Sequence, residues 1–199
     1  MSNRLCLLVL GIAAVTVACS GQGSQPVSPS AAGMAAKSSA GAPLGPMAVE
    51  TGAGQKIGMY DNCDPASFNA AVGPGTCIGM GTRTFASFIE QLTRFHTIGE
   101  WRFSPTPISV KVGDTFTAFN LGGETHTFTE VEEFGGGIND TLNSLVGLTV
   151  KAPECTQLPG AAFIPPGATT TDHADDPGVE KYQCCIHPWM RATVRIAAH

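Results

Sequence analysis

Apolar and polar residues alternate with a period of two over much of the second half of the chain. Ile108, Val110 and Val112 alternate with polar residues, and this pattern predicts a half-buried strand. Gly113-Asp114 follows as a hairpin-turn signal and predicts a return strand over 115–120. Further short strands are predicted at 127–131, near 169, at 178–185 and at 192–197. Several short strands with turn signals between them indicate an all-β protein, a β-sandwich.

A helical period appears earlier in the chain. Five apolar residues fall on one face of a helix: Phe85, Phe88, Ile89, Leu92 and Phe95. With Thr84 before them as a candidate N-cap and Gly99 beyond them, they predict a helix over about 85–97. We expect its Phe residues to pack in the core, and His96 to be a surface or partly buried residue rather than a ligand. Residues 134–160 predict only an irregular insertion.

The first 18 residues have the pattern of a secretory signal peptide. Arg4 precedes an apolar run over 5–17 that is too short for an ordinary transmembrane helix. Ala18-Cys19-Ser20 looks like a bacterial lipobox in which Cys19 is lipidated, although Thr16 stands where an apolar residue is usual. Ordinary cleavage nearby is the alternative. We therefore expect the protein in the periplasm or cell envelope, with membrane contact only through a lipid anchor at Cys19.

Residues 19–57 are dominated by Gly, Ser, Ala and Pro, and this composition predicts a flexible tether. About 140 residues then remain, which is enough for one domain. The formal net charge of the whole chain is −5. Removal of residues 1–18 takes away Arg4 and no acidic residue, so it becomes about −6. A mildly acidic protein of this kind is not expected to bind nucleic acid, although a basic partner could be steered toward it.

The candidate chemistry lies near the C-terminus. Cys184, His187 and Met190 follow one another at three-residue steps and offer a thiolate, an imidazole and a thioether. His126 is the candidate for a second imidazole. This ligand set is that of a mononuclear electron-transfer copper site. A structural zinc site would need a second Cys/His pair at matching spacing, which the sequence lacks. The remaining alternatives are another metal, or simple packing of these side chains near a C-terminal strand.

With these residues the chain resembles the cupredoxins, most closely the amicyanin and plastocyanin-like small blue copper proteins. The shared pattern is Asn-x5-His at 120–126 with a later Tyr-x-Cys-x2-His-Pro-x-Met at 182–190. The resemblance covers about 101–199 and implies a Greek-key β-sandwich, with 58–100 as a helical N-terminal extension packed on it. It also implies one type 1 copper ion bound by four residues: His126, Cys184, His187 and Met190.

The sequence departs from the family pattern on both sides of His126. Thr125 stands where many cupredoxins have Pro, and Thr127 stands where they have Asn. That Asn usually joins the two ligand loops through hydrogen bonds. Thr127 offers a hydroxyl for this purpose but no amide.

The resemblance implies an electron carrier rather than an enzyme. Its partners would be redox proteins, such as a cytochrome or a copper or quinone oxidoreductase. In this family the loop His presents its ring edge at the surface, so His187 would pass electrons here. Leu121, Gly122 and Gly123 could form an apolar docking face, with Trp189 either beside it or packed in the core.

Two other functions fit the same ligands. A copper storage or delivery protein usually has an exposed site that is rich in Met or His, and no Met-rich motif is present. A subunit of a larger copper reductase or oxidase would need further His ligands. The other His residues show no His-x-His spacing: His96, His173 and His199.

The Cys count restricts the covalent structure. Cys6 lies in the signal peptide and Cys19 is the lipidation candidate, so five Cys remain in the domain: Cys63, Cys77, Cys155, Cys184 and Cys185. One copper thiolate and two disulfides would account for this odd number in an oxidising compartment. Cys63 and Cys77 form the natural local pair, which leaves Cys155 for Cys185.

Neighbouring residues of a strand point to opposite faces, so Cys184 at the metal would direct Cys185 away from it. Two rival assignments exist. Cys185 could be the ligand, or a vicinal Cys184–Cys185 disulfide could form, which would destroy the site.

Overall fold

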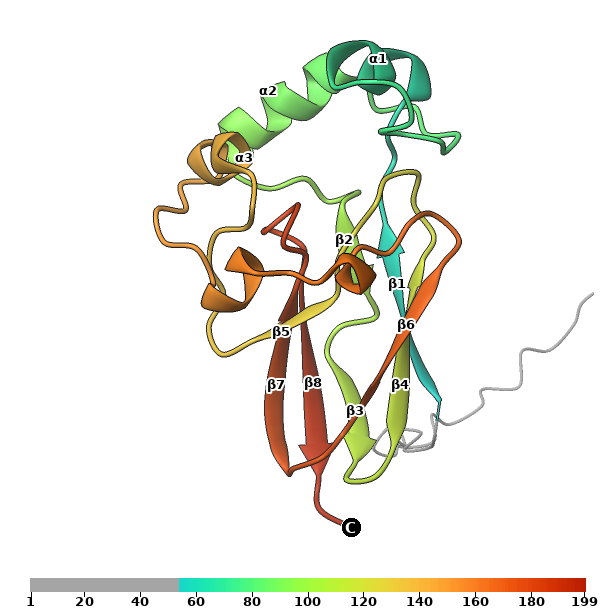
Figure 1. Ribbon diagram of the computed structural model, residues 1–199, viewed down its shortest axis with the longest axis vertical. Coiled ribbons are helices and arrows are strands. Elements are labelled where there is room, and N and C mark those ends of the chain that lie inside the picture. The colour runs from blue at the N-terminus through green and yellow to red at the C-terminus, as the bar shows by residue number, and fades with distance from the viewer. Residues whose placement is uncertain (1–53) are drawn as a thin grey trace, which may run out of the picture. The chain divides into compact units, whose positions relative to one another are not determined.

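The computed structural model describes residues 54–199, and strands dominate this part of the chain (Figure 1). One sheet has the order β2 (Arg102–Ser104), β1 (Gln55–Tyr60), β4 (Thr115–Asn120), β6 (Thr169–His173). The other has the order β3 (Ile108–Lys111), β8 (Arg191–Ala197), β7 (Gly178–Gln183), β5 (Thr129–Val131). Both sheets are mixed, because β1 pairs with β4 and β3 pairs with β8 in parallel while the other pairs are antiparallel.

The two sheets share one hydrophobic core. Buried and half-buried residues alternate along β4, as expected for a strand with one face in the core. Phe116 of β4 and Tyr182 of β7 meet edge to face across the core, with ring centroids 5.6 Å apart. The all-β prediction is therefore confirmed at the level of two mixed sheets that enclose a common core.

Strand β1 corrects the predicted domain boundaries. Residues 55–57 were expected in the tether and 58–60 in an extension outside the sandwich, but β1 lies between β2 and β4. Ile57 and Met59 are fully buried, and Ile57 pairs with Ala118 of β4. The prediction missed this strand because its two apolar residues alternate with Lys56 and Gly58 over too short a run to be recognised.

The hairpin predicted at Gly113-Asp114 is wrong, although both flanking strands are present. Strand β3 pairs with β8, whereas β4 pairs with β1 and β6. The turn therefore carries the chain from one sheet to the other. Gly113 has a φ of 86°, a conformation that favours glycine, and its N–H donates to the carbonyl of Ala174.

Helices α1 (Pro65–Ala71), α2 (Phe85–Phe95) and α3 (Asp140–Leu145) gather at one end of the two sheets (Figure 1). The predicted N-cap of α2 is confirmed, since the Thr84 side chain accepts from the Ser87 N–H. The helix ends at Phe95, earlier than expected, because His96 turns into the left-handed region with φ 58°. His96 is exposed, and its Nδ1 lies 2.7 Å from the carbonyl of Leu145.

The expected irregular insertion contains short helices. Besides α3 it includes the 3-10 helix Pro153–Thr156, and the 3-10 helix Gly160–Ala162 follows directly. A hydrophobic cluster of Val131, Ala152, Cys155 and Cys185 packs part of this region against the end of β5.

Both predicted disulfides are confirmed: Cys63–Cys77 and Cys155–Cys185. Cys184 is free and buried. The signal peptide, Cys19 and the tether up to residue 53 lie outside the described residues. Within the described part, no helix combines the length and the apolar character that a membrane span requires.

Candidate metal centre

Three of the four predicted ligands meet at the end of the sandwich that carries the helices. His126 lies between β4 and β5, while Cys184 and His187 lie in the segment that joins β7 to β8. The Sγ of Cys184 is 3.8 Å from the Nδ1 of His126 and 3.8 Å from the Nδ1 of His187. The two Nδ1 atoms are 3.3 Å apart. All three side chains are buried.

This triangle has the size that a metal ion requires. A point equidistant from three atoms with these separations lies about 2.1 Å from each, and metal bonds to imidazole nitrogen and thiolate sulfur are about 2.0–2.3 Å. A thiolate with two imidazoles in a trigonal arrangement suits copper. The donor set and its spacing therefore fit the ion that the sequence predicts.

Cys184 is prepared to act as a thiolate. Burial alone would raise the pKa of its thiol, but hydrogen bonds with His126 and His187 outweigh burial and hold that pKa well below its ordinary value. The backbone N–H groups of Thr127 and His187 also point at Sγ, at 3.4 and 3.5 Å. Because the thiolate is the ligand form, the protein presents this sulfur ready to bind a metal.

Asp61 fixes the orientation of His126. Its Oδ2 accepts a hydrogen bond from Nε2 of His126 at 2.9 Å, and a carboxylate that only accepts requires the proton to be on Nε2. The same carboxyl accepts the N–H groups of Gly123 and Glu124, both at 2.9 Å. The Asp61 side chain is 1% exposed. Nδ1 of His126 is therefore turned toward Cys184 and His187.

Asp61 and His126 shift each other's ionisation. Burial opposes ionisation of Asp61, but the hydrogen bonds from His126, Glu124 and Gly123 lower its pKa to about 2. Burial likewise opposes protonation of His126, but Asp61 and Cys184 raise its pKa to about 9. Without a metal, His126 is thus a cation that lies between two anions.

Thr127 joins the two ligand loops in place of the expected Asn. Its hydroxyl oxygen accepts the N–H of Cys185 at 2.7 Å and a hydrogen bond from the Thr129 hydroxyl at 3.1 Å. The hydroxyl thus makes a cross-loop contact of the kind that the family pattern assigns to Asn. Asn120 shapes the first loop, because its amide donates to the carbonyls of Glu124 and Ile164, both at 2.8 Å.

Met190 belongs to the same loop and is fully buried. Its N–H donates to the carbonyl of His187 at 2.9 Å, and its carbonyl accepts the N–H of Cys184 at 3.0 Å. These two hydrogen bonds close the loop between Cys184 and Met190. Met190 therefore lies on the compact turn that also carries the Cys and His ligands.

The expected exposed edge of His187 is corrected by the structure, in which this residue is only 4% exposed. Its Nε2 lies 3.7 Å from Oε2 of Glu124, and that oxygen accepts the indole N–H of Trp101 at 2.7 Å. Burial raises the pKa of Glu124. The helical segment before residue 101 supplies the cover, because Phe88 of α2 packs on both Trp101 and Trp189.

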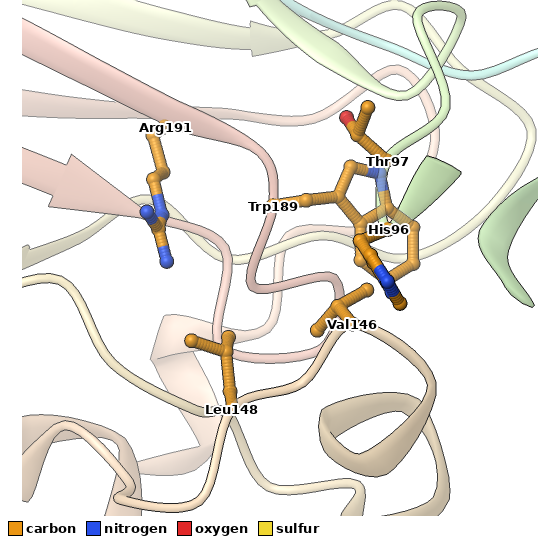
Figure 2. A pocket seen from close by; sticks show the side chains of 6 residues that line it. All are labelled: His96, Thr97, Val146, Leu148, Trp189 and Arg191. Atoms are coloured by element: carbon orange, nitrogen blue, oxygen red, sulfur yellow. The ribbon is translucent and has the colours of Figure 1, made fainter. Parts of the chain in front are cut away.

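Trp189 is partly buried between His187 and the surface. The ring centroids of His187 and Trp189 are 5.4 Å apart. On its other side Trp189 lines a surface cavity of about 260 Å³, opposite Arg191 (Figure 2). Its Nε1 is buried and has no hydrogen-bond partner among the described residues. Trp189 was expected either beside the docking face or packed in the core. In the structure it both packs against His187 and lines a surface cavity.

Leu121 is exposed, whereas Gly123 is buried against Gly79 and the Cys63–Cys77 disulfide. A Cβ on Gly123 would lie 2.6 Å from the Gly79 nitrogen. The docking face expected at 121–123 is therefore reduced largely to Leu121, because the N-terminal extension covers this face at Gly123.

Sequence reasoning missed Asp61 and Glu124. Neither belongs to a spacing motif, and Asp61 lies 65 positions before its partner His126. Asp61, Cys63 and Glu124 also form a compact group of potential ligands. Cys63 is in a disulfide, so this group offers no thiolate for a second metal.

No protein-family model matches the chain, and no curated protein sequence matches it. Solved structures that resemble it include cupredoxins. A purple cupredoxin from Nitrosopumilus maritimus is 17% identical, with 72% of this chain and 99% of that chain covered and a TM-score of 0.41. An oxidised plastocyanin from Dryopteris crassirhizoma is 14% identical, with 71% and 99% covered and a TM-score of 0.36.

A reduced P52G mutant of amicyanin is 23% identical, with 47% of this chain and 71% of that chain covered and a TM-score of 0.30. At these TM-scores the similarities do not establish the family. The functional conclusion therefore depends on the geometry of the site.

Proposed function

We propose that this chain is an electron carrier of the cell envelope with one type 1 copper ion, bound by His126, Cys184, His187 and Met190 in a cupredoxin-type Greek-key sandwich. The observation that carries the proposal is the buried triangle of two Nδ1 atoms and one Sγ, 3.3–3.8 Å apart. Bound copper supplies one-electron exchange between Cu(I) and Cu(II).

The residues around the triangle hold the ligands in place through a change of oxidation state. Asp61 fixes His126, two backbone N–H groups point at the sulfur, and Thr127 joins the loops. The Cys155–Cys185 disulfide anchors the residue next to Cys184. Ligands that cannot rearrange keep the reorganisation on electron transfer small, which favours a carrier.

The same burial is unfavourable for copper storage or delivery. All three donor side chains are at most 4% exposed, so an ion could not be handed over without opening the loop. A carrier also needs no substrate-binding residues, and we propose no catalytic role. Its partners would be redox proteins outside the cytoplasm.

Electrons would enter or leave by a covered route, because His187 is only 4% exposed. Trp189 contacts His187 and lines a surface cavity, so it offers an aromatic link between the site and a docked partner. This route replaces the exposed imidazole edge that the family resemblance implies.

The colour of the copper-loaded protein tests the proposal. Charge transfer from the Cys184 sulfur to Cu(II) should give an intense visible band, and Cys184→Ser should abolish it. The matched control is the double variant Cys155→Ser/Cys185→Ser, which keeps Cys184. It should retain the band but lose about 2–5 kcal/mol of stability with its disulfide.

A wild-type protein that binds Cu(II) without an intense band would contradict the type 1 assignment. A folded double variant that is colourless would show that Cys184 alone is not the sulfur ligand.

A further inference from the structure

A cleft of about 310 Å³ lies between α1 and α2 on one side and α3 on the other, directly over His187. Its walls are mainly apolar side chains: Phe68, Phe85, Phe88, Ile89, Leu142 and Ile186. An apolar cavity of about 150 Å³ is large enough to bind benzene. The cleft is about twice that size, so it can hold an aromatic ring with substituents.

Glu124 contributes an almost buried carboxylate to the lining of the cleft, beside the buried ring of His187. The Glu124 side chain is 9% exposed, and Oε2 accepts the indole N–H of Trp101. Oε1 has no hydrogen-bond partner among residues 54–199. The other polar side chains of the lining are His187, which is buried, Thr76, which is half-buried, and Asn139 and Thr141, which are exposed and lie at the rim. An almost buried acceptor in the lining of an apolar cleft leaves room for one hydrogen-bond donor from a ligand.

The charge of the donor can be argued from the same contacts. The Glu124 carboxylate is already shared between Trp101 and the nearby Nε2 of His187, 3.7 Å away. Burial of an ammonium ion is far more costly than burial of a hydroxyl, and here it would have only part of one carboxylate as a partner. A neutral donor therefore fits better than a cation.

We infer that this cleft binds a small phenol, with the hydroxyl donating to Oε1 of Glu124 and the ring held between the Phe and Leu side chains. A second hydroxyl at the far end, as in a hydroquinone, would reach the polar rim at Asn139 and Thr141. The bound ring would lie against His187. This site goes beyond the proposed electron carrier, and its assembly needs no metal.

A ligand series on the wild-type protein tests the chemistry without any variant. Phenol, anisole and benzylammonium are titrated into metal-free and copper-loaded protein, and binding is followed by NMR shifts of the Leu142 and Ile186 methyl groups. Phenol should bind saturably to both forms. Anisole has no donor and should bind about tenfold or more weakly, since a hydrogen bond to a charged group is lost.

Two tryptophan variants locate the site. Leu142→Trp should fill the cleft and reduce phenol binding at least tenfold. Leu148→Trp is the matched control, because Leu148 lines the separate cavity beside Trp189 (Figure 2). It should leave phenol binding unchanged.

Several results would overturn the inference. These are no saturable binding of phenol to metal-free protein, equal affinity for anisole, tighter binding of benzylammonium, or full binding by a folded Leu142→Trp variant. Because the metal-free protein is tested separately, failure of the phenol site is distinguishable from failure of the copper site, which the visible band reports.

Discussion

A single carboxylate, Asp61, connects three parts of the candidate site. It accepts hydrogen bonds from the imidazole of His126 and from the backbone of Gly123 and Glu124. A Cβ on Gly122 would lie only 2.0 Å from its Oδ2. The glycine at position 122 is thus needed for the close approach of the ligand loop to Asp61.

Asp61→Asn should weaken copper binding about 10–100-fold, as expected when the partner of a ligating His is changed. Asn has one acceptor oxygen, and its NH₂ would face groups that also donate. The metal-free protein should lose about 2 kcal/mol, which corresponds to a pKa of about 2 against 3.8. Copper titration and urea unfolding at neutral pH measure the two effects.

The pH dependence of this loss has a definite sign. Because folding lowers the pKa of Asp61, its stabilisation is present above about pH 3.8 and is lost as the pH falls through about 2. The difference between wild type and Asp61→Asn should therefore shrink in acid. Asp64→Asn is the matched control, since Asp64 caps α1 and Asn caps equally well. Equal copper affinity in wild type and Asp61→Asn would contradict the positioning role.

Copper uptake should release about one proton at about pH 7.5. His126 has a pKa of about 9 in the metal-free protein, so it carries a proton on Nδ1 that the metal must displace. The pKa of the Cys184 thiol is held well below its ordinary value, so we expect Cys184 to contribute no proton. Above about pH 9 the release should decline, because His126 is then already neutral.

Calorimetry in two buffers of different ionisation enthalpy measures the number of protons that copper uptake releases. Release of two protons would mean that a second ligand besides His126 is protonated before binding, and release of none would mean that His126 is neutral.

For individual residues, the sequence predicts the metal ligands better than it predicts the residues that position them. His126, Cys184 and His187 belong to spacing patterns that reflect the needs of one ion, so they could be found. Asp61 and Glu124 are single carboxylates whose roles arise only when distant segments meet. Nothing in their local sequence distinguishes them from surface acids.

Among the secondary-structure elements, strand positions were more predictable than strand partners. The alternation of residues located β3 and β4 correctly, because a period of two reflects one buried face. It carries no information about the neighbouring strand, so the expected hairpin between them was wrong. Helix α2 was found with its N-cap because its pattern is long and its capping residue is local.

The position of β1 gives a prediction about the minimal domain. A chain that begins at Gly54 should fold and bind copper, whereas one that begins at Asp61 should not fold. The shorter chain keeps Asp61 but loses β1, and with it the burial of Ile57 and Met59, worth about 2 kcal/mol each. It also exposes the edges of β2 and β4.

Circular dichroism with thermal melting compares the two chains, and a chain that begins at Pro46 is the control. A cooperative melt of the chain that begins at Asp61 would show that β1 is dispensable.

In the part of the chain that the structure describes, the helical segment and its disulfide cover the side of the candidate metal site where a docking surface was expected. The Cys63–Cys77 bridge and α1 and α2 lie where the family resemblance implied an open docking face. Cys155–Cys185 fixes the opposite side of the ligand loop. Disulfides are typical of proteins in oxidising compartments, and the export predicted from the first 18 residues would place the protein in one.

Export and anchoring remain predictions from the sequence, and Cys19 provides the test. If Cys19 is lipidated, Cys19→Ala protein should be absent from the membrane fraction and should incorporate no labelled fatty acid. Copper binding should be unchanged, because the described domain begins near residue 54 and contains every proposed ligand. The variant would lose only the high local concentration that a membrane anchor provides for partners on the same membrane. Cys6→Ala, within the apolar run, is the matched control and should partition as wild type does. Exported Cys19→Ala protein that still partitions with membranes as wild type does would show that lipid attachment at Cys19 is the wrong account of this N-terminus.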